Sequence, residues 1–281
     1  MKTKQVVATN EIPSDLLENY NKKIQQGKIL WKEKKVVICG LARNCKNTID
    51  KNIELINRLG QYFKEYKIVI FENNSNDGTR KKISSYEEVD LIGSNDGEDF
   101  SSGYEESRIK RLARYRSEVQ NHIRNNHSDY DHVIIIDLDI KLWSIDGILT
   151  SLAWDKDFDV MGSVSLAYKP EQLSEDGFIH YDRWAFKFHT WHEEFSIAQE
   201  MDMRWFTYWK PPIGAKPIKC LSVFGGLAIY KMEAFLSGIY GHKHPEEIGG
   251  FNTVEHAQFH YTLHKNKYNK IYLNPSQRCI V

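Results

Sequence analysis

The chain has 281 residues, 41% of them hydrophobic, which suits one large α/β domain or two small ones. Lysine plus arginine equals aspartate plus glutamate at 38 each, so a general attraction to nucleic acid or to an anionic membrane is not expected. The N-terminus has no apolar core of signal-peptide length, no segment reaches the roughly 20 apolar residues of a membrane span, and the four cysteines form no CxxC pair. We therefore expect a soluble, reduced, cytoplasmic protein.

Short apolar runs alternate with helical patterns along the first part of the chain. Residues 1–34 are polar and lysine-rich, with a weak helical pattern over 14–30, and we expect a helical lead-in there. Continuous apolar runs bounded by turn residues are typical of buried parallel strands. Such strands are expected at 36–39, 68–71, 89–92 and 133–136, with helices at about 49–63, after the turn at 72–78, and at about 104–124. This alternation predicts an α/β fold with a mostly parallel central sheet and helices on both faces.

The second part of the chain is less regular. Strands are expected at 159–166 and 219–230, the latter bent at Phe224-Gly225-Gly226, followed by a helix at about 254–264 and a strand at 270–273. We find no repeat, low-complexity tract or obvious linker. The prediction is one domain over 35–281, with halves of about 35–140 and 141–281.

Polar residues follow the predicted parallel strands, where ligands bind in doubly wound sheets. Among them, Asp137-Leu138-Asp139 follows a run of four apolar residues, and strand alternation would put both carboxylates on one side with Leu138 opposite. Two carboxylates this close repel each other unless a cation or hydrogen-bond donors lie between them, and Mg²⁺ or Mn²⁺ would satisfy both. The alternative is that one aspartate caps the next helix and the other is solvated.

Arg116 lies within the apolar face of the helix at 104–124. A buried guanidinium must be paired, so its partner would be a carboxylate at a strand end, in a structural salt bridge, or a phosphate. Glu72 begins the turn after the second strand and could accept hydrogen bonds from a base or a ribose hydroxyl. Its other possible roles are a helix cap and a partner for Arg116.

Glu255 and His256 open the last helix. Glu255 is a candidate general base, or a charge that is favourable to the helix dipole. His256, His260 and His264 share one helical face, and His256 could assist the aspartate pair more readily than the three could form a separate zinc site. Gly225-Gly226 would let the backbone approach a sugar closely, although a strand bend explains the pair nearly as well. Aromatic residues cluster over 181–209, as either a carbohydrate surface or a core cluster.

Together these segments resemble the GT-A class of nucleotide-sugar glycosyltransferases, and within it the fungal capsule-associated mannosyltransferases and related bacterial and viral enzymes. The resemblance covers roughly residues 35–275. It rests on the order of several motifs: Cys39-Gly40-Leu41-Ala42-Arg43-Asn44, residues 71–79, Arg108 to Arg116, Asp137-Leu138-Asp139, residues 181–186, residues 224–230 and Glu255-His256.

The resemblance implies a role for each motif. The half at 35–140 would bind the nucleotide-sugar donor, and the half at 141–281 an oligosaccharide or glycoconjugate acceptor. The implied donor contacts are Leu41, Ala42, Arg43, Glu72, Asn74, Arg116, Asp137, Leu138 and Asp139. The implied acceptor contacts are Trp184, Gly225 and Gly226. Asp137 and Asp139 would hold Mn²⁺ or Mg²⁺.

The resemblance leaves the stereochemistry and the full metal site open. Glu255 matches the base of inverting members, whereas the capsule mannosyltransferases retain configuration. The inverting pattern has Glu-Asp where this chain has Glu255-His256, and no histidine follows His264. Either His256 supplies a metal ligand or the two aspartates hold the metal alone.

The favoured function is a metal-dependent transferase that moves one sugar from a UDP-sugar, such as UDP-xylose, UDP-glucose or UDP-galactose, to a glycan hydroxyl, with Glu255 as general base and inversion of configuration. A retaining enzyme that uses GDP-mannose is the runner-up. A nucleotidyltransferase is disfavoured because residues 40–44 lack a glycine-rich phosphate loop, and the intact aspartate pair disfavours a catalytically silent glycan-binding module.

Overall fold

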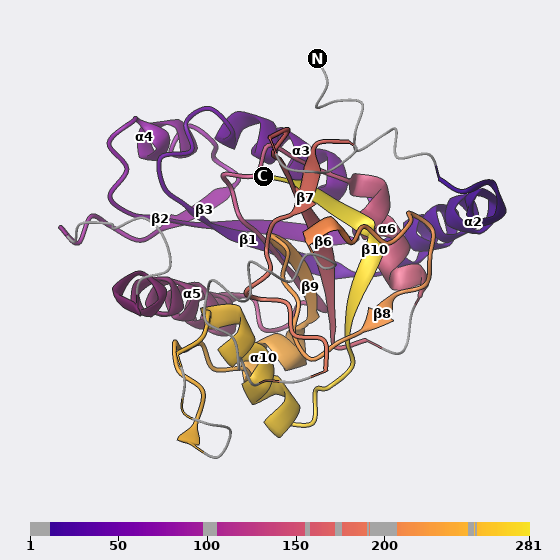
Figure 1. Cartoon of the computed structure of the whole chain (residues 1–281). Coiled ribbons are helices and arrows are strands. Elements are labelled where there is room, and N and C mark those ends of the chain that lie inside the picture. The colour runs from indigo at the N-terminus through magenta and orange to yellow at the C-terminus, as the bar shows by residue number, and fades with distance from the viewer. Residues whose placement is uncertain are drawn as a thin grey trace.

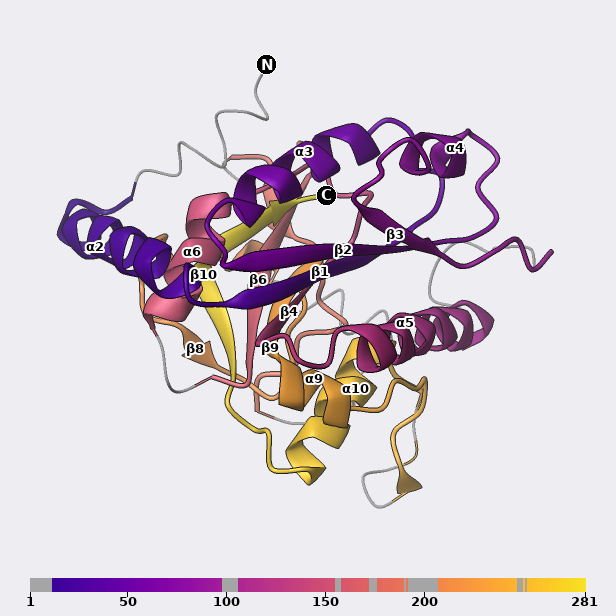
Figure 2. The same ribbon diagram turned by 180° about the vertical axis from the view of Figure 1, so that it is seen from behind.

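The computed structural model describes residues 12–97, 106–154, 158–171, 176–189, 191, 207–246, 250 and 252–281. Strands there form one sheet in the order β3-β2-β1-β4-β9-β6-β10-β5, with β7 on β6 and β8 on β10. Helices lie on both sides of this sheet (Figures 1 and 2). Within the described ranges, every helix is too short or too polar to span a bilayer.

The first half follows the predicted alternation closely. Its elements are α2 (Ser14–Trp31), β1 (Lys35–Ala42), α3 (Ile49–Gly60), β2 (Glu65–Glu72), α4 (Thr79–Ile83), β3 (Val89–Ile92), α5 (Glu106–Asn126) and β4 (His132–Ile136). Strands β3, β2, β1 and β4 are all parallel. The predicted α/β class is therefore confirmed, and its parallel strands are the ones that the apolar runs indicated.

The second half completes the sheet with strands of both directions. Strand β9 (Leu227–Lys231) runs antiparallel to both β4 and β6 (Val160–Tyr168). The long β10 (Ile271–Ile280) is parallel to β6 and antiparallel to the short β5 (Leu142–Trp143). The remaining elements are α6 (Ile145–Ala153), β7 (Phe178–His180), β8 (Ile218–Lys219), α9 (Met232–Ser237) and α10 (Glu255–Lys265).

The side chains of β1 alternate between two cores. Val36 and Ile38 pack with residues of α2, α3 and α6, whereas Val37 and Cys39 pack with residues of α5, α9 and α10. In Figure 1, α3 accordingly lies on the opposite side of the sheet from α5 and α10. Because both faces of β1 are buried, its consecutive residues are apolar and do not alternate with polar ones.

Three sequence expectations differ from the structure. The strand expected at 219–230 is two strands, β8 and β9, because Gly225 and Gly226 adopt positive φ angles of 67° and 74° between them. Helices α6 and α9 were not predicted; α6 begins where the Ser144 side chain accepts a hydrogen bond from the Gly147 amide.

Strand β10 continues seven residues beyond its predicted end at 273. The sequence NPSQR has no strand pattern, and the ladder with β6 shifts register between Asn274 and Arg278. These polar side chains are nevertheless buried, because Asn274 bonds to Thr150 and Ser151 and Gln277 bonds to Ser163. Tertiary hydrogen bonds thus override the local polarity.

Candidate functional site

The ends of three parallel strands meet at one edge of the sheet. Strand β1 lies between β2 and β4, and Ala42 is paired with Glu72 in the register of β1 and β2. A Cβ atom added to Gly40 would lie 2.0 Å from the Ile136 carbonyl oxygen, so glycine permits the close approach of β1 and β4. The chain order along the sheet reverses here, and ligands bind at such points in α/β folds.

Asp137 and Asp139 lie in a turn directly after β4. The strand ends at Ile136, and the Ile140 amide donates to the Asp137 carbonyl oxygen. Leu138 is buried, its carbonyl oxygen accepts from Thr48 and Asn52, and Asp139 is exposed. Leu138 is therefore buried while Asp137 and Asp139 reach solvent, but the three residues form a turn and not the strand from which the alternation was predicted.

Arg116 connects this turn to the last helix. Its Nη2 donates to Asp137 Oδ1 and its Nε to Glu255 Oε1, both at 2.9 Å. The Arg116 side chain is 6% exposed, and its guanidinium lies 5.0 Å from the Phe224 ring centroid. A charge buried on α5 is thus paired with carboxylates from the turn after β4 and from α10.

Burial and neighbouring charges shift the pKa values of Asp137 and Arg116. Desolvation is the main effect that raises the pKa of Asp137, to about 7; Asp139 and Glu255 act in the same direction and Arg116 opposes them. Because 32% of the Asp137 side chain is exposed, water offsets part of this shift. Burial alone would lower the pKa of Arg116, but Asp137 and Glu255 raise it, and the guanidinium stays charged. A second cation beside Asp137 would stabilise the ionised form of its carboxyl group.

A glycine turn joins the two halves beside Asp137. The Asp137 amide donates to the Gly226 carbonyl oxygen at 2.9 Å. The Gly225 amide donates to Asp182 Oδ2, also at 2.9 Å, and desolvation raises the pKa of Asp182. We assigned no role to Asp182 from the sequence, because only the fold brings residues 182 and 225 together.

His256 is buried behind this turn. Its ring stacks on Phe224 with centroids 3.7 Å apart, and both ring nitrogens lack hydrogen-bond partners among the described residues. Desolvation and the charge of Arg116 lower its pKa well below the ordinary value, so the ring is neutral. The ligand atoms of Asp137, Asp139 and His256 do not form a group within 4.8 Å of one another in the described part of the chain. His260 bonds to Ser222 and Tyr230, and His264 to the Leu221 carbonyl oxygen.

The other predicted donor contacts line the same edge. Leu41 is half-buried, Ala42 is buried, and Arg43 is half-buried where the chain leaves β1. Glu72 is fully buried, with Oε1 accepting from the Ser75 amide and Oε2 bound to Arg80 at 2.9 Å. Arg80, which sequence reasoning did not single out, is thus its partner rather than Arg116.

Asn74 lies in the loop after β2, and Trp184 lies in the loop after β7. Asn74 has a φ of 52°, and its amide donates to Asn95. Trp184 is half-buried, and its neighbour Arg183 donates to Thr207. Of the aromatic cluster at 181–209, residues 190 and 192–206 lie outside the described residues.

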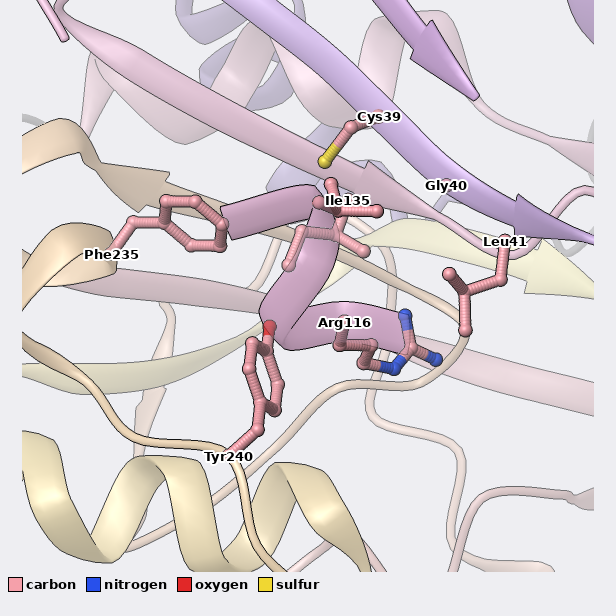
Figure 3. A pocket seen from close by; sticks show the side chains of 8 residues that line it. Cys39, Gly40, Leu41, Arg116, Ile135, Phe235 and Tyr240 are labelled. Atoms are coloured by element: carbon pink, nitrogen blue, oxygen red, sulfur yellow. The ribbon is translucent and has the colours of Figure 1, made fainter. Parts of the chain in front are cut away.

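A small pocket opens beside Arg116. Its volume is about 10 Å³, roughly the space of one water molecule, and it is lined by Cys39, Gly40, Leu41, Arg116, Val119, Ile135, Phe235 and Tyr240. Figure 3 shows the guanidinium of Arg116 extending to the Leu41 side of this pocket. Typical ligand pockets measure roughly 300–1,000 Å³, so a whole nucleotide sugar does not fit inside it.

The aspartate pair fits a hard divalent cation. Both carboxylates reach solvent, their charges repel each other, and carboxylate oxygens are the ligands that Mg²⁺ and Mn²⁺ prefer. Two protein carboxylates leave coordination positions for phosphate oxygens and water.

Several solved structures have a similar fold, while no protein-family model and no curated protein matches the sequence. A mycobacterial protein aligns with 92% of this chain and 70% of its own, at 10% identity and a TM-score of 0.50. Glucosyl-3-phosphoglycerate synthase from Mycobacterium tuberculosis, in complex with Mn²⁺, UDP and phosphoglyceric acid, aligns with 92% of this chain and 72% of its own, at 10% identity and a TM-score of 0.48.

A mannosyltransferase from Pyrobaculum calidifontis, in complex with GDP-Man and Mn²⁺, aligns with 95% of this chain at 16% identity and a TM-score of 0.45. The present chain spans 66% of that protein, slightly less than two thirds. These likenesses concern the fold alone.

Proposed function

We propose that this protein is a metal-dependent glycosyltransferase that moves one sugar from a nucleotide-diphosphate donor to a hydroxyl of a glycan acceptor. The observation that carries the proposal is the cluster at the edge of the sheet. The exposed Asp139 lies in one turn with Asp137, and Arg116 ties Asp137 to Glu255. Such a cluster combines a site for a cation with a fixed positive charge, and both suit a diphosphate.

Each residue of the cluster would have a separate task. Asp137 and Asp139 would hold Mn²⁺ or Mg²⁺, which when bound neutralises charge on the departing diphosphate. Arg116 would keep Asp137 oriented through its 2.9 Å hydrogen bond. Leu41, Ala42 and Arg43 would border the nucleoside. Because both oxygens of Glu72 are already engaged, its task would be to hold the loop at 73–77 in position beside the donor.

The acceptor would approach from the glycine turn. The Gly226 carbonyl oxygen accepts a hydrogen bond from the Asp137 amide, so a sugar against Gly225-Gly226 would lie close to the metal site. Trp184 would stack on that sugar. Glu255 would remove the proton of the acceptor hydroxyl as general base, which implies inversion at the anomeric carbon.

A retaining reaction is the second candidate, and one observation favours it. The Glu255 side chain is only 8% exposed, and its Oε1 already accepts from Arg116. A carboxylate so engaged is better placed to position Arg116 than to abstract a proton. In that case a UDP-sugar or GDP-mannose donor would react with retention.

The proposal is tested by a thermal-shift panel of UDP, GDP, CDP and TDP, each with and without Mn²⁺. A ligand at a hundredfold its Kd adds about 2.7 kcal/mol to the unfolding free energy, on the order of 4–5 °C at this size. A Mn²⁺-dependent shift with one nucleotide would support the proposal and identify the base, with UDP the expected one. The proposal would be abandoned if no nucleotide shifted the transition and no nucleotide sugar were hydrolysed.

A further inference from the structure

A second group of metal-ligating side chains lies away from the strand ends. Asp90 is on β3, His122 is on α5, and His127 follows the end of α5. Asp90 Oδ2 lies 3.2 Å from His127 Nε2 and 3.6 Å from His122 Nε2. One ligand atom from each residue lies within 4.8 Å of the other two, and no other such trio exists among the described residues.

These distances suit a metal ion with tetrahedral coordination. Zinc lies about 2.0–2.1 Å from a histidine nitrogen and about 2.0–2.2 Å from a carboxylate oxygen, which sets neighbouring ligand atoms roughly 3.3 Å apart. The two measured separations, 3.2 and 3.6 Å, lie on either side of that value. Little movement of the side chains would therefore be needed to take up the ion.

His122 distinguishes this group from a simple hydrogen-bonded cluster. His127 already bonds to Asp90, but His122 Nε2 is shielded from solvent and, at 3.6 Å from Asp90 Oδ2, makes no hydrogen bond in the described part of the chain. A shielded nitrogen that makes no hydrogen bond is costly, and a metal ion shared with Asp90 would satisfy it. The Asp90 side chain is 46% exposed, which leaves room for a water ligand.

The ligand types select the ion. Two imidazoles and one carboxylate suit zinc and its neighbours among the transition metals, whereas Mg²⁺, Mn²⁺ and Ca²⁺ prefer oxygen ligands. The aspartate pair after β4 offers only oxygen ligands and should have the opposite preference. The two sites are also apart, since His122 follows Arg116 by six residues, or about 9 Å along α5.

We propose that Asp90, His122 and His127 form a zinc site, with water as the fourth ligand. Strand β3 is the last strand on its side of the sheet, and Figure 2 shows it and α5 at the same end of the molecule. Zinc would link the C-terminal end of α5 to this edge strand. Helix α5 also carries Arg116, so the link would help to hold α5 in place. The site does not depend on the proposed transferase activity.

The experiment is a calorimetric titration with Zn²⁺ alone, made on Asp139→Asn protein so that the aspartate pair does not contribute. We expect one equivalent of Zn²⁺ to bind, and Co²⁺ in its place to give the strong visible bands of tetrahedral coordination. His122→Gln should weaken Zn²⁺ binding at least tenfold, because one of three protein ligands is lost. His189→Gln, an exposed histidine outside the group, is the matched control and should bind as the parent does.

Asp90→Asn is the second variant, at an exposed position that tolerates substitution, and it should also weaken binding at least tenfold. The proposal is overturned if Zn²⁺ binds equally well to the parent and to both variants, or if the parent binds none. Octahedral, weakly absorbing Co²⁺ would likewise contradict the proposed coordination. Nucleotide binding to otherwise unaltered protein is measured separately, so failure of this site leaves the proposed function untouched.

Discussion

The Arg116 guanidinium lies 2.9 Å from the Asp137 carboxylate, and this contact joins the longest helix among the described residues to the turn after β4. The same guanidinium is bonded to Glu255 at the start of α10. Residues 116, 137 and 255 are far apart in the sequence but form one ionic cluster, in which Arg116 and Glu255 are buried and Asp137 is partly exposed. Removing one partner of such a cluster leaves an uncompensated charge, so each member can be tested separately.

Replacing Arg116 should affect both stability and activity. In Arg116→Lys, the ammonium cannot reproduce two hydrogen bonds in the planar arrangement of a guanidinium. We expect the unfolding free energy to fall by about 2 kcal/mol and sugar transfer to fall on the order of 100-fold. Urea unfolding and initial rates measure the two effects. Arg124→Lys, on the exposed side of the same helix, should change neither; wild-type rates in Arg116→Lys would contradict the assigned role.

Asp139→Asn should separate metal binding from folding. Its carboxylate is exposed and raises the pKa of Asp137, so its removal relieves repulsion without creating a cavity. The thermal midpoint should stay within about 1 °C of the parent, as for other surface substitutions. The Mn²⁺-dependent stabilisation by nucleotide should disappear. Asp15→Asn, at an exposed aspartate in α2, is the control; undiminished Mn²⁺ dependence in Asp139→Asn would remove Asp139 from the metal site.

Glu255→Gln tests whether Glu255 acts as the general base. Glutamine keeps an oxygen that can accept the Arg116 Nε hydrogen bond, so the cluster should remain assembled. Loss of a general base lowers turnover by about 10²–10⁴-fold, while donor affinity should change by less than about threefold. Glu233→Gln, in the first turn of α9, should be neutral. Near-normal turnover in Glu255→Gln would instead favour the retaining reaction, which the anomeric configuration of the product would verify by NMR.

Gly225→Ala should distort the turn beside Asp137. Gly225 has a φ of 67°, and an added Cβ would lie 2.1 Å from the backbone oxygen of Ser163. Strain and overlap together should cost about 2–4 kcal/mol. Gly97→Ala, at a positive φ of 72° with no other described atom within 4 Å of the added Cβ, should cost only the strain, about 1 kcal/mol. Equal costs in the two variants, measured by urea unfolding, would show that the contact with Ser163 is unimportant.

Buried neutral histidines should make the protein sensitive to acid. Burial is the main cause that lowers the pKa of both His180 and His260 to about 3, with Arg183 and His264 adding to it. Unfolded histidine has a pKa near 6.5, so below that pH the unfolded chain binds more protons than the folded one. Their stabilising contribution is complete above pH 6.5 and is lost as the pH falls from 6.5 towards 3.

His260→Gln isolates one of these contributions. Between pH 7 and pH 5 the parent should lose about 2 kcal/mol through His260 alone, and the variant should lose that much less. Unfolding free energies at pH 7, 6 and 5 measure the difference. Parallel curves for the parent and His260→Gln would contradict the buried neutral state.

The local pattern of the sequence determined the parallel part of the fold. Runs such as Val36–Cys39 and Val133–Ile136 are apolar at every position, as expected for strands that are covered on both faces. Because helical patterns alternate with these runs, the strands were expected to be parallel and to end at one edge of the sheet. The same logic brought Leu41, Glu72 and Asp137 to that edge. An arginine within an apolar helical face indicated that Arg116 is buried and paired.

Only the tertiary structure decided which groups meet there. Helix periodicity could not choose between Asp137, Glu72 and phosphate as the partner of Arg116, because that choice depends on how α5 and α10 pack against the sheet. Burial of the polar β10 segment, the bond from Gly225 to Asp182 and the approach of Asp90 to His122 and His127 are likewise contacts between distant parts of the chain. No local propensity encodes such contacts, since their free energy arises only when the elements have packed.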